Sequence, residues 1–204
     1  MAILYDKARS VAAFLVILLS GHVLVAQSQT YQAPTNEEWD AIYRVIFPKV
    51  SDSFDARTQE YAMDLRIAPS FRASSQLSIV KFRTGDLVIT RYDVKNRELP
   101  IFEQLIALPD YRADPDYAVL AKSLAVEKRS PANVSSIIGH LRSFFNNTGF
   151  RTEKNFSLDG VFYEVWYEDT GSKFYFGQSG EEKYDPKESK RITNIRKVME
   201  SSEK

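Results

Sequence analysis

The sequence predicts an α+β fold, in which antiparallel β-hairpins form a sheet packed against amphipathic helices. Two hairpin patterns, near residues 85 and 171, support this prediction. Amphipathic helix patterns lie before, between and after them. Strands and helices do not alternate one by one, which argues against a parallel sheet built from βαβ units.

The N-terminal residues have the layout of a signal peptide over residues 1–26. Lys7 and Arg9 precede nine apolar residues, 11–19, and the small residue Ala26 stands at the expected cleavage site. Nine residues are too few to cross a membrane, which takes about 20. We therefore expect an exported protein, periplasmic or extracellular, with no membrane span after cleavage. An uncleaved anchor is the alternative.

Residues 27–36 are polar and aperiodic, which is typical of a tether. Residues 37–204 then form a single α+β domain, with 37–129 and 130–204 as an alternative division into sub-units. Thr35 and Glu38 form a capping box that begins a helix. One face of this helix carries Trp39, Ile42, Tyr43 and Ile46, and Pro48 ends it.

A strand is expected over Glu60–Ile67, followed by a clearer hairpin. Leu77–Arg83 and Leu87–Val94 are rich in Ile, Val, Phe and Tyr, and Thr84-Gly85-Asp86 separates them. Glycine supplies the tight turn that such a hairpin requires.

Prolines mark the next helices, because a proline at the first helical position gives up an N–H that has no partner there anyway. Pro100 begins a short helix to Leu108, and Asp114-Pro115 begins one that reaches Leu124, with Asp114 as N-cap. Ser130-Pro131 begins the third, whose apolar arc consists of Val134, Ile137, Ile138, Leu141, Phe144 and Phe145. Between the last two, residues 125–129 form an edge strand.

A second hairpin joins 158–168 to 173–177 through residues 169–172, and a charged helix follows over 188–200. A four-residue turn pairs Glu168 with Lys173 and Trp166 with Tyr175. One face of this hairpin is then apolar, whereas the other alternates aromatic and charged side chains. That second face either packs beneath a helix or meets water.

Trp166, Tyr175 and Glu164 on this mixed face are the candidate binding residues. Aromatic rings flanked by a carboxylate can stack on a sugar ring or hold a partner peptide. The alternative is a cross-strand aromatic pair that only stabilises the hairpin.

The string from Ser157 to Trp166, followed by a turn and Lys173-Phe174-Tyr175-Phe176, resembles the C-terminal hairpin of small exported bacterial proteins of unknown function. Those proteins read Leu-Asp-Gly-Thr-x-Tyr-Glu-Leu, whereas Val161 replaces the threonine here. The resemblance covers about 45 residues. It implies export and an α+β architecture, and no particular activity.

The composition leaves few groups for catalysis. The chain has no cysteine, and cleavage at Ala26 leaves His140 as its one histidine. These counts argue against a zinc site and against thiol chemistry, and we expect no metal and no cofactor. His140 lies at the edge of an apolar helix face, and no serine has hydrolase-elbow spacing. The balance of 27 basic and 27 acidic residues disfavours nucleic acid as a partner.

We therefore expect a non-enzymatic exported protein of the bacterial envelope, of binding or accessory type, whose partner is an envelope protein or a carbohydrate. The alternative is a carboxylate-dependent hydrolase of extracellular glycans, with two carboxyl groups about 5 to 9 Å apart. An inhibitor or assembly subunit, marked by a large apolar patch, is the third class. The oligomeric state stays open.

Overall fold

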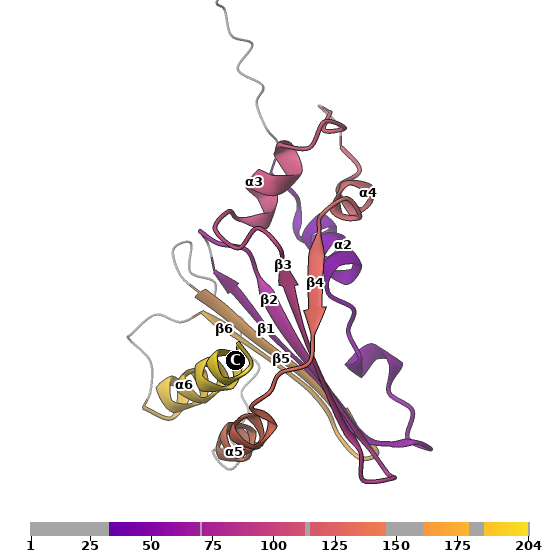
Figure 1. The fold of residues 1–204 in the computed structure, drawn as a ribbon, viewed down its shortest axis with the longest axis vertical. Helices are drawn as coiled ribbons and strands as arrows, with labels where there is room; N and C mark the ends of the chain where they lie inside the picture. The colour runs from indigo at the N-terminus through magenta and orange to yellow at the C-terminus, as the bar shows by residue number, and fades with distance from the viewer. Residues whose placement is uncertain (1–32, 70, 113–114, 146–160, 180–185, 204) are drawn as a thin grey trace, which may run out of the picture. The chain divides into compact units, whose positions relative to one another are not determined.

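The computed structural model describes residues 33–203 except 70, 113–114, 146–160 and 180–185 (Figure 1). These residues form an antiparallel sheet with strand order β4-β3-β2-β1-β5-β6 and helices beside it, which confirms the α+β fold. The strands are β1 Gln59–Pro69, β2 Ser75–Phe82, β3 Leu87–Val94, β4 Val126–Arg129, β5 Val161–Asp169 and β6 Lys173–Ser179. The expected leader and most of the tether lie outside the described residues.

The helices largely follow the capping signals. They are α2 Asn36–Ile46, α3 Ile101–Ile106, α4 Tyr117–Ala121, α5 Val134–Phe145 and α6 Pro186–Ser201, and a short 3-10 turn, η1, covers Ser51–Ser53. The predicted capping box is present, because Thr35 Oγ1 accepts from the Glu38 amide and Glu38 Oε2 accepts from the Thr35 amide. Among the described helices, none has the length and hydrophobicity to cross a membrane.

Several helix boundaries differ from the prediction, and α3 ends at Ile106 rather than Leu108. Asp116, not Asp114, is the N-cap of α4, since its Oδ1 accepts from the Val119 amide at 3.0 Å, and α4 stops at Ala121. Helix α5 begins at Val134, three residues after Pro131. Helix α6 begins at Pro186, two residues earlier than expected. The last case is the proline signal again, because Pro186 occupies the first helical position.

The C-terminal hairpin has the predicted register. Glu168 pairs with Lys173, and Trp166 pairs with Tyr175. The turn is held by Asp169, whose Oδ1 accepts from the Gly171 and Ser172 amides at 2.8 and 2.7 Å. Strand β4 is an edge strand, as expected, and β1 lies between β2 and β5.

The sheet separates two cores, because successive strand residues point to opposite faces. Odd-numbered positions of β1 pack under α5 and α6, which lie side by side on one face (Figure 1). This core contains Met63, Leu65, Leu77, Ile79, Ile89, Ile137, Leu141, Phe144, Tyr163, Val165, Phe176, Ile192, Ile195, Val198 and Met199. The second core joins α2, α3 and α4 to Val94 of β3.

Two even-numbered positions in the middle of β1 belong to a polar layer on the opposite face. Asp64 and Arg66 are buried there, at 0% and 4% exposure. Two charged residues in succession on one strand face require partners from neighbouring strands, because an isolated buried charge is strongly unfavourable. Helix α2 and β5 supply the surroundings of Arg66, and these form the candidate site.

Candidate binding site

A cavity of about 670 Å³ opens beside α2 and the start of α3, over the polar layer of the sheet. We call it the α2–α3 cavity. Its volume lies within the range of about 300 to 1,000 Å³ that is usual for small-molecule sites. Its walls are Asn36, Trp39, Asp40, Tyr43, Arg66, Ala68, Pro69, Phe71, Arg72, Ser74, Pro100, Ile101, Phe102, Glu103, Phe162, Glu164 and Tyr175.

A buried ion pair lies in the wall of this cavity. Arg66 Nε donates to Glu164 Oε2 at 2.6 Å, and Arg66 Nη2 forms an ion pair with the same oxygen. The other carboxylate oxygen, Oε1, accepts from the Tyr175 hydroxyl at 2.9 Å. Burial and the Glu164 charge raise the pKa of Tyr175 well above its usual value, so this hydroxyl stays protonated and donates. Both oxygens of Glu164 therefore have protein donors.

Aromatic rings hold the Arg66 guanidinium in place. Its Cζ lies 3.8 Å from the ring centre of Tyr43 and 4.8 Å from that of Trp166. The Lys49 ammonium also lies 3.9 Å from the Trp166 ring centre. A guanidinium interacts favourably with aromatic faces, so these contacts stabilise its position. Among the described residues, Glu164 is the sole hydrogen-bond acceptor of the Arg66 guanidinium.

Gly177 gives the Tyr175 side chain its position. Both residues lie on the same face of β6, and Gly177 pairs with Glu164 across the hairpin. A Cβ added at Gly177 would lie 2.8 Å from Tyr175 Cζ, closer than real Cβ contacts allow. The ring therefore lies over the glycine, which brings its hydroxyl to Glu164.

The remaining walls are strongly aromatic. Trp39 and Tyr43, one helical turn apart on α2, stack with ring centres 5.5 Å apart. Phe102 comes from α3 and Phe162 from β5, and Phe71, between β1 and β2, is 71% exposed. Flat apolar walls around a fixed polar pair are suited to a ligand with both ring faces and hydroxyl groups.

Of the three predicted binding residues, Glu164 belongs to the buried ion pair, and Tyr175 and Trp166 lie against it. Glu164 and Tyr175 line the cavity, while Trp166 lies behind Arg66 and pairs with Tyr175 at 5.5 Å. Trp166 and Tyr175 are half-buried, so their face of the hairpin packs against other elements and is not fully open to water. The cross-strand aromatic pair is present, and two of the three residues also border a cavity.

Sequence reasoning did not single out Arg66, Trp39 or Tyr43 as site residues. The helix pattern places Trp39 and Tyr43 on the apolar face of α2, but both stay half-buried at the cavity. A signal for Arg66 was available, because Asp64 and Arg66 alternate with apolar neighbours in a strand. That alternation marks a polar sheet face, although it does not reveal the partner.

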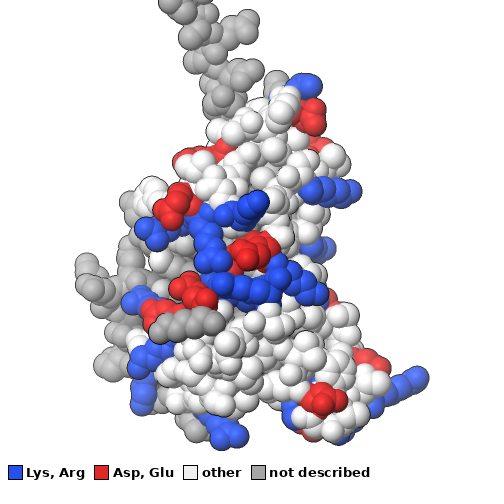
Figure 2. Space-filling model, viewed as in Figure 1, with Lys and Arg blue, Asp and Glu red and all other residues white. Residues whose placement is uncertain are grey.

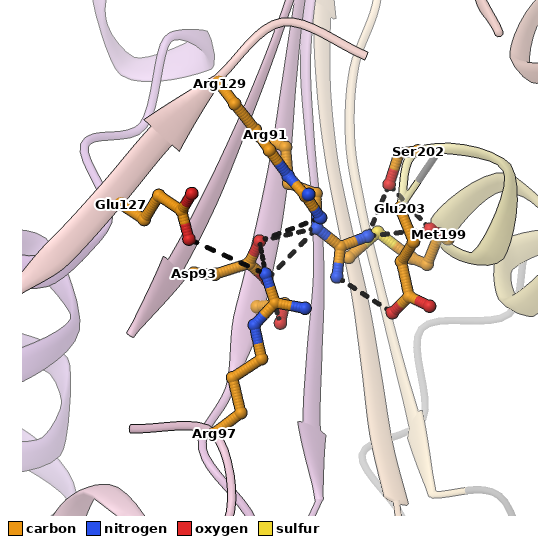
Figure 3. A network of polar contacts seen from close by, with 9 residues as sticks. Arg91, Asp93, Arg97, Glu127, Arg129, Met199, Ser202 and Glu203 are labelled. Carbon is orange, nitrogen blue, oxygen red and sulfur yellow. Dashed lines mark hydrogen bonds and ion pairs between the residues drawn. The ribbon is translucent and has the colours of Figure 1, made fainter. Parts of the chain in front are cut away.

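A second polar cluster lies on the other face of the sheet, around Asp93 (Figure 3). Arg91 Nε donates to both oxygens of this fully buried carboxylate, at 3.0 and 2.8 Å, and Arg97 Nη2 donates at 2.8 Å. Arg129 Nη2 lies 3.5 Å from Asp93 Oδ2. Burial opposes ionisation of Asp93, but hydrogen bonds from Arg91 and Ser75 and the nearby guanidiniums lower its pKa below the usual value.

This cluster attaches the C-terminal helix to the sheet. Arg91 Nη1 donates to the Met199 carbonyl and to Ser202 Oγ, at 2.7 and 2.5 Å, and Nη2 donates to Glu203. Acidic and basic side chains also gather together across the middle of the surface in Figure 2. With Glu127, whose Oε2 lies 3.9 Å from Arg97 Nη2, three guanidiniums and three carboxylates balance one another, so we assign the cluster to stability.

Asp64 is a third buried acid, and it has a different kind of environment. Its Oδ2 accepts from the Ser51 amide and hydroxyl, at 2.9 and 2.7 Å, and its Oδ1 accepts from Ser78 Oγ and Gln76 Nε2. These donors are all neutral. Burial raises the pKa of the Asp64 carboxyl, although the hydrogen bonds from Ser78 and Ser51 act in the opposite direction.

Metal-binding groups do not gather in the part of the chain that the structure describes. No group of three or more His, Asp or Glu side chains there has an arrangement that could hold a metal ion. His140 is half-buried on α5, at the boundary position expected from the helix pattern.

Comparison with known proteins gives no match: no family model, no curated protein and no solved structure is significantly similar to this chain.

Proposed function

We propose that this protein is an exported protein of the bacterial envelope that binds a carbohydrate in the α2–α3 cavity without transforming it. The observation that carries the proposal is the buried Arg66–Glu164 pair in the wall of an aromatic cavity. Buried ion pairs are often no more stabilising than apolar residues of similar volume. Placement of this pair beside a cavity therefore supports a role in ligand recognition.

The charges of the lining favour a neutral, polar ligand. Two arginines, Arg66 and Arg72, face three carboxylates, Asp40, Glu103 and Glu164. A strongly anionic ligand would meet an excess of carboxylates, whereas sugar hydroxyls can donate to carboxylates and accept from guanidiniums. Aromatic walls would stack on the apolar faces of the sugar rings.

Binding is favoured over hydrolysis because Glu164 is already occupied. Its two oxygens accept from Arg66 and Tyr175, so attack on an anomeric carbon would require these contacts to break, whereas Oε1 keeps a second lone pair that can accept from a sugar hydroxyl. A carboxylate-dependent glycan hydrolase is the second candidate, because Asp40 and Glu103 line the same cavity. Glycosidases require two such groups on opposite sides of the scissile bond.

Intrinsic fluorescence tests the binding proposal directly, because Trp39 and Trp166 are the two tryptophans of the chain. Trp166→Phe leaves Trp39, in the cavity wall, as the reporter. We expect titration with neutral hexasaccharides of glucose or N-acetylglucosamine to change its emission. Trp39→Ala removes this reporter, so its affinity is measured by calorimetry; it should weaken binding about tenfold or more, as removal of a central aromatic contact typically does.

Phe54→Ala is the matched control, because Phe54 is a half-buried aromatic residue outside the cavity lining. It should leave the affinity unchanged. The absence of binding to these probes and to a wider panel of envelope glycans, measured by calorimetry, would refute the proposal. Equal weakening by Trp39→Ala and Phe54→Ala would show that the cavity is not the site.

Incubation of the protein with the same hexasaccharides distinguishes hydrolysis from binding alone. Release of reducing ends from the hexasaccharides, abolished by Asp40→Asn or Glu103→Gln, would show hydrolysis. Unchanged oligosaccharides would support binding alone.

Export is tested by the mass of the protein recovered outside the cytoplasm of a bacterial host. We expect a chain that begins at Gln27, because Ala26 stands at the expected cleavage site. An intact N-terminus in a membrane fraction would show an anchor instead.

A further inference from the structure

A second cavity, of about 350 Å³, lies between α5 and the sheet. We call it the α5 cavity. It opens on the face of the sheet that packs against α5 and α6, whereas the α2–α3 cavity borders the opposite face. Its lining consists of Tyr61, Met63, Lys81, Leu87, Ile138, Leu141, Arg142, Phe145 and Tyr167.

Most of this lining is apolar and well fixed. On α5, residues 138, 141, 142 and 145 follow helical spacing, so one strip of the helix faces the cavity. The Phe145 ring packs against Tyr167 and Phe174, with ring centres 5.4 and 6.1 Å apart. Met63 and Leu141 belong to the core that packs under α5 and α6. The site is therefore a preformed apolar space.

Its charged lining residues are both cationic. Lys81 and Arg142 line the cavity, and no carboxylate does. Neither cation forms an ion pair with a residue that the structure describes. Lys81 Nζ donates to the Gly85 carbonyl, which uses one of the three donors of an ammonium group. The remaining donors of Lys81 and the exposed guanidinium of Arg142 can bind an anion.

We propose that the α5 cavity binds an anionic amphiphile with a single acyl chain, a fatty-acid carboxylate. The chain lies against Met63, Leu141 and Phe145, where burial of its methylene groups is favourable. The carboxylate contacts Lys81 and Arg142. A neutral lipid would leave both cations without a counter-charge, and a small anion would leave the apolar walls unfilled.

Dodecanoate, used below its micellar concentration, is the test ligand, and dodecanol is its uncharged counterpart. Binding is measured by calorimetry on the purified full-length protein, with tyrosine resonances followed by NMR. We expect dodecanoate to bind more tightly than dodecanol and to shift the resonances of Tyr61 and Tyr167. Lys81→Gln and Arg142→Gln should each weaken dodecanoate binding about twofold to fivefold, the usual effect of a partly exposed charge contact.

Two further variants separate the cavity from other apolar surface. Ile138→Phe fills the cavity and should abolish dodecanoate binding while the melting temperature stays close to that of the wild type. Lys122→Gln removes an exposed cation outside the lining and should have no effect. The loss of binding in Ile138→Phe is decisive because the full-length protein retains the apolar residues 11–19, which can themselves bind an acyl chain outside the cavity.

Several outcomes would overturn the proposal. One is equal affinity for dodecanoate and dodecanol, which would exclude recognition of the carboxylate. Another is dodecanoate binding that survives Ile138→Phe, which would place the ligand elsewhere. The absence of any binding would exclude the site altogether.

Discussion

Asp64 is a fully buried carboxyl group surrounded by neutral donors, so its pKa in the native state differs from its pKa in the unfolded chain. Burial raises its pKa in the native state above the value of about 4 that it has in an unfolded chain. As the pH rises past 4, the unfolded chain loses this proton first. The native state then binds more protons than the unfolded state, so the contribution of Asp64 to stability falls with rising pH.

Replacement of Asp64 with asparagine removes this titration. We therefore expect the free energy of unfolding of Asp64→Asn, relative to the wild type, to increase between pH 3 and pH 6. Urea unfolding at several pH values measures this difference. Asp110→Asn changes an exposed carboxyl and is the control. A difference that stays constant across this pH range would contradict the argument.

Arg66 and Glu164 form a different kind of buried contact, because each supplies the charge that the other requires. They are 4% and 7% exposed, so water does little to replace a lost partner. Removal of one member of a buried pair leaves an uncompensated charge and typically destabilises by about 3 to 5 kcal/mol.

A double-mutant cycle tests this coupling. Arg66→Met and Glu164→Gln should each lower the free energy of unfolding by about 3 kcal/mol, and the double variant should be clearly less destabilised than the sum. Urea unfolding at pH 7 measures all four proteins. Lys173→Met with Glu168→Gln, the exposed pair in the same hairpin, should show a coupling below about 1 kcal/mol. Additive effects at Arg66 and Glu164 would contradict the pairing.

In the β5–β6 hairpin, the absence of a side chain at Gly177 leaves room for an aromatic ring. The Tyr175 ring lies over Gly177, and this position lets the hydroxyl reach Glu164 on the neighbouring strand. Glycine is otherwise unfavourable inside a strand, so its presence at this point of β6 has a packing reason.

Gly177→Ala should therefore destabilise the protein by about 1 to 3 kcal/mol, the usual effect of overpacking. The same substitution in a Tyr175→Ala background should have a much smaller effect, because the ring that it displaces is gone. Thermal unfolding of the four proteins measures this non-additivity. Equal destabilisation in both backgrounds would show that the backbone, and not the Tyr175 ring, requires glycine.

The described residues before and after position 130 share one sheet and one hydrophobic core. Strand β1 pairs with β2 on one side and with β5 on the other, so the sheet is continuous across this position. Apolar residues of β1 to β3, such as Leu65, Leu77 and Ile79, pack under α5 and α6 from the second half. Without that half, one whole face of the first three strands would meet water.

We accordingly expect residues 33–129 and 130–204, produced as separate fragments, to lack cooperative unfolding and dispersed amide resonances. Mixing them should restore both, because burial of the shared face drives their association. Circular dichroism and two-dimensional NMR measure the outcome, with residues 33–204 as the control. A folded fragment 33–129 would show instead that the two segments are independent sub-units.

Local chemistry explains why many elements were predictable. The Thr35–Glu38 capping box, the hairpin turn at Gly85 and the register of β5 with β6 all depend on residues close together in the chain. Helix starts were less predictable, because a proline near the start of a helix does not determine which residue is the N-cap, whose side chain accepts from the first backbone amides. At α4 this residue is Asp116, whose side chain reaches the Val119 amide.

Local patterns thus decide which segments of this chain become strands and helices, and which face of each is apolar. They did not bring Arg66 to Glu164, which lies 98 residues away, or Arg91 to Ser202, which lies 111 residues away. Those contacts follow from the strand order, in which β1 pairs with a hairpin formed nearly 100 residues later. Strand order is set by burial of both sheet faces at once. The α2–α3 cavity is therefore a property of the assembled fold, although Glu164 and Tyr175 in its wall were recognisable from their hairpin alone.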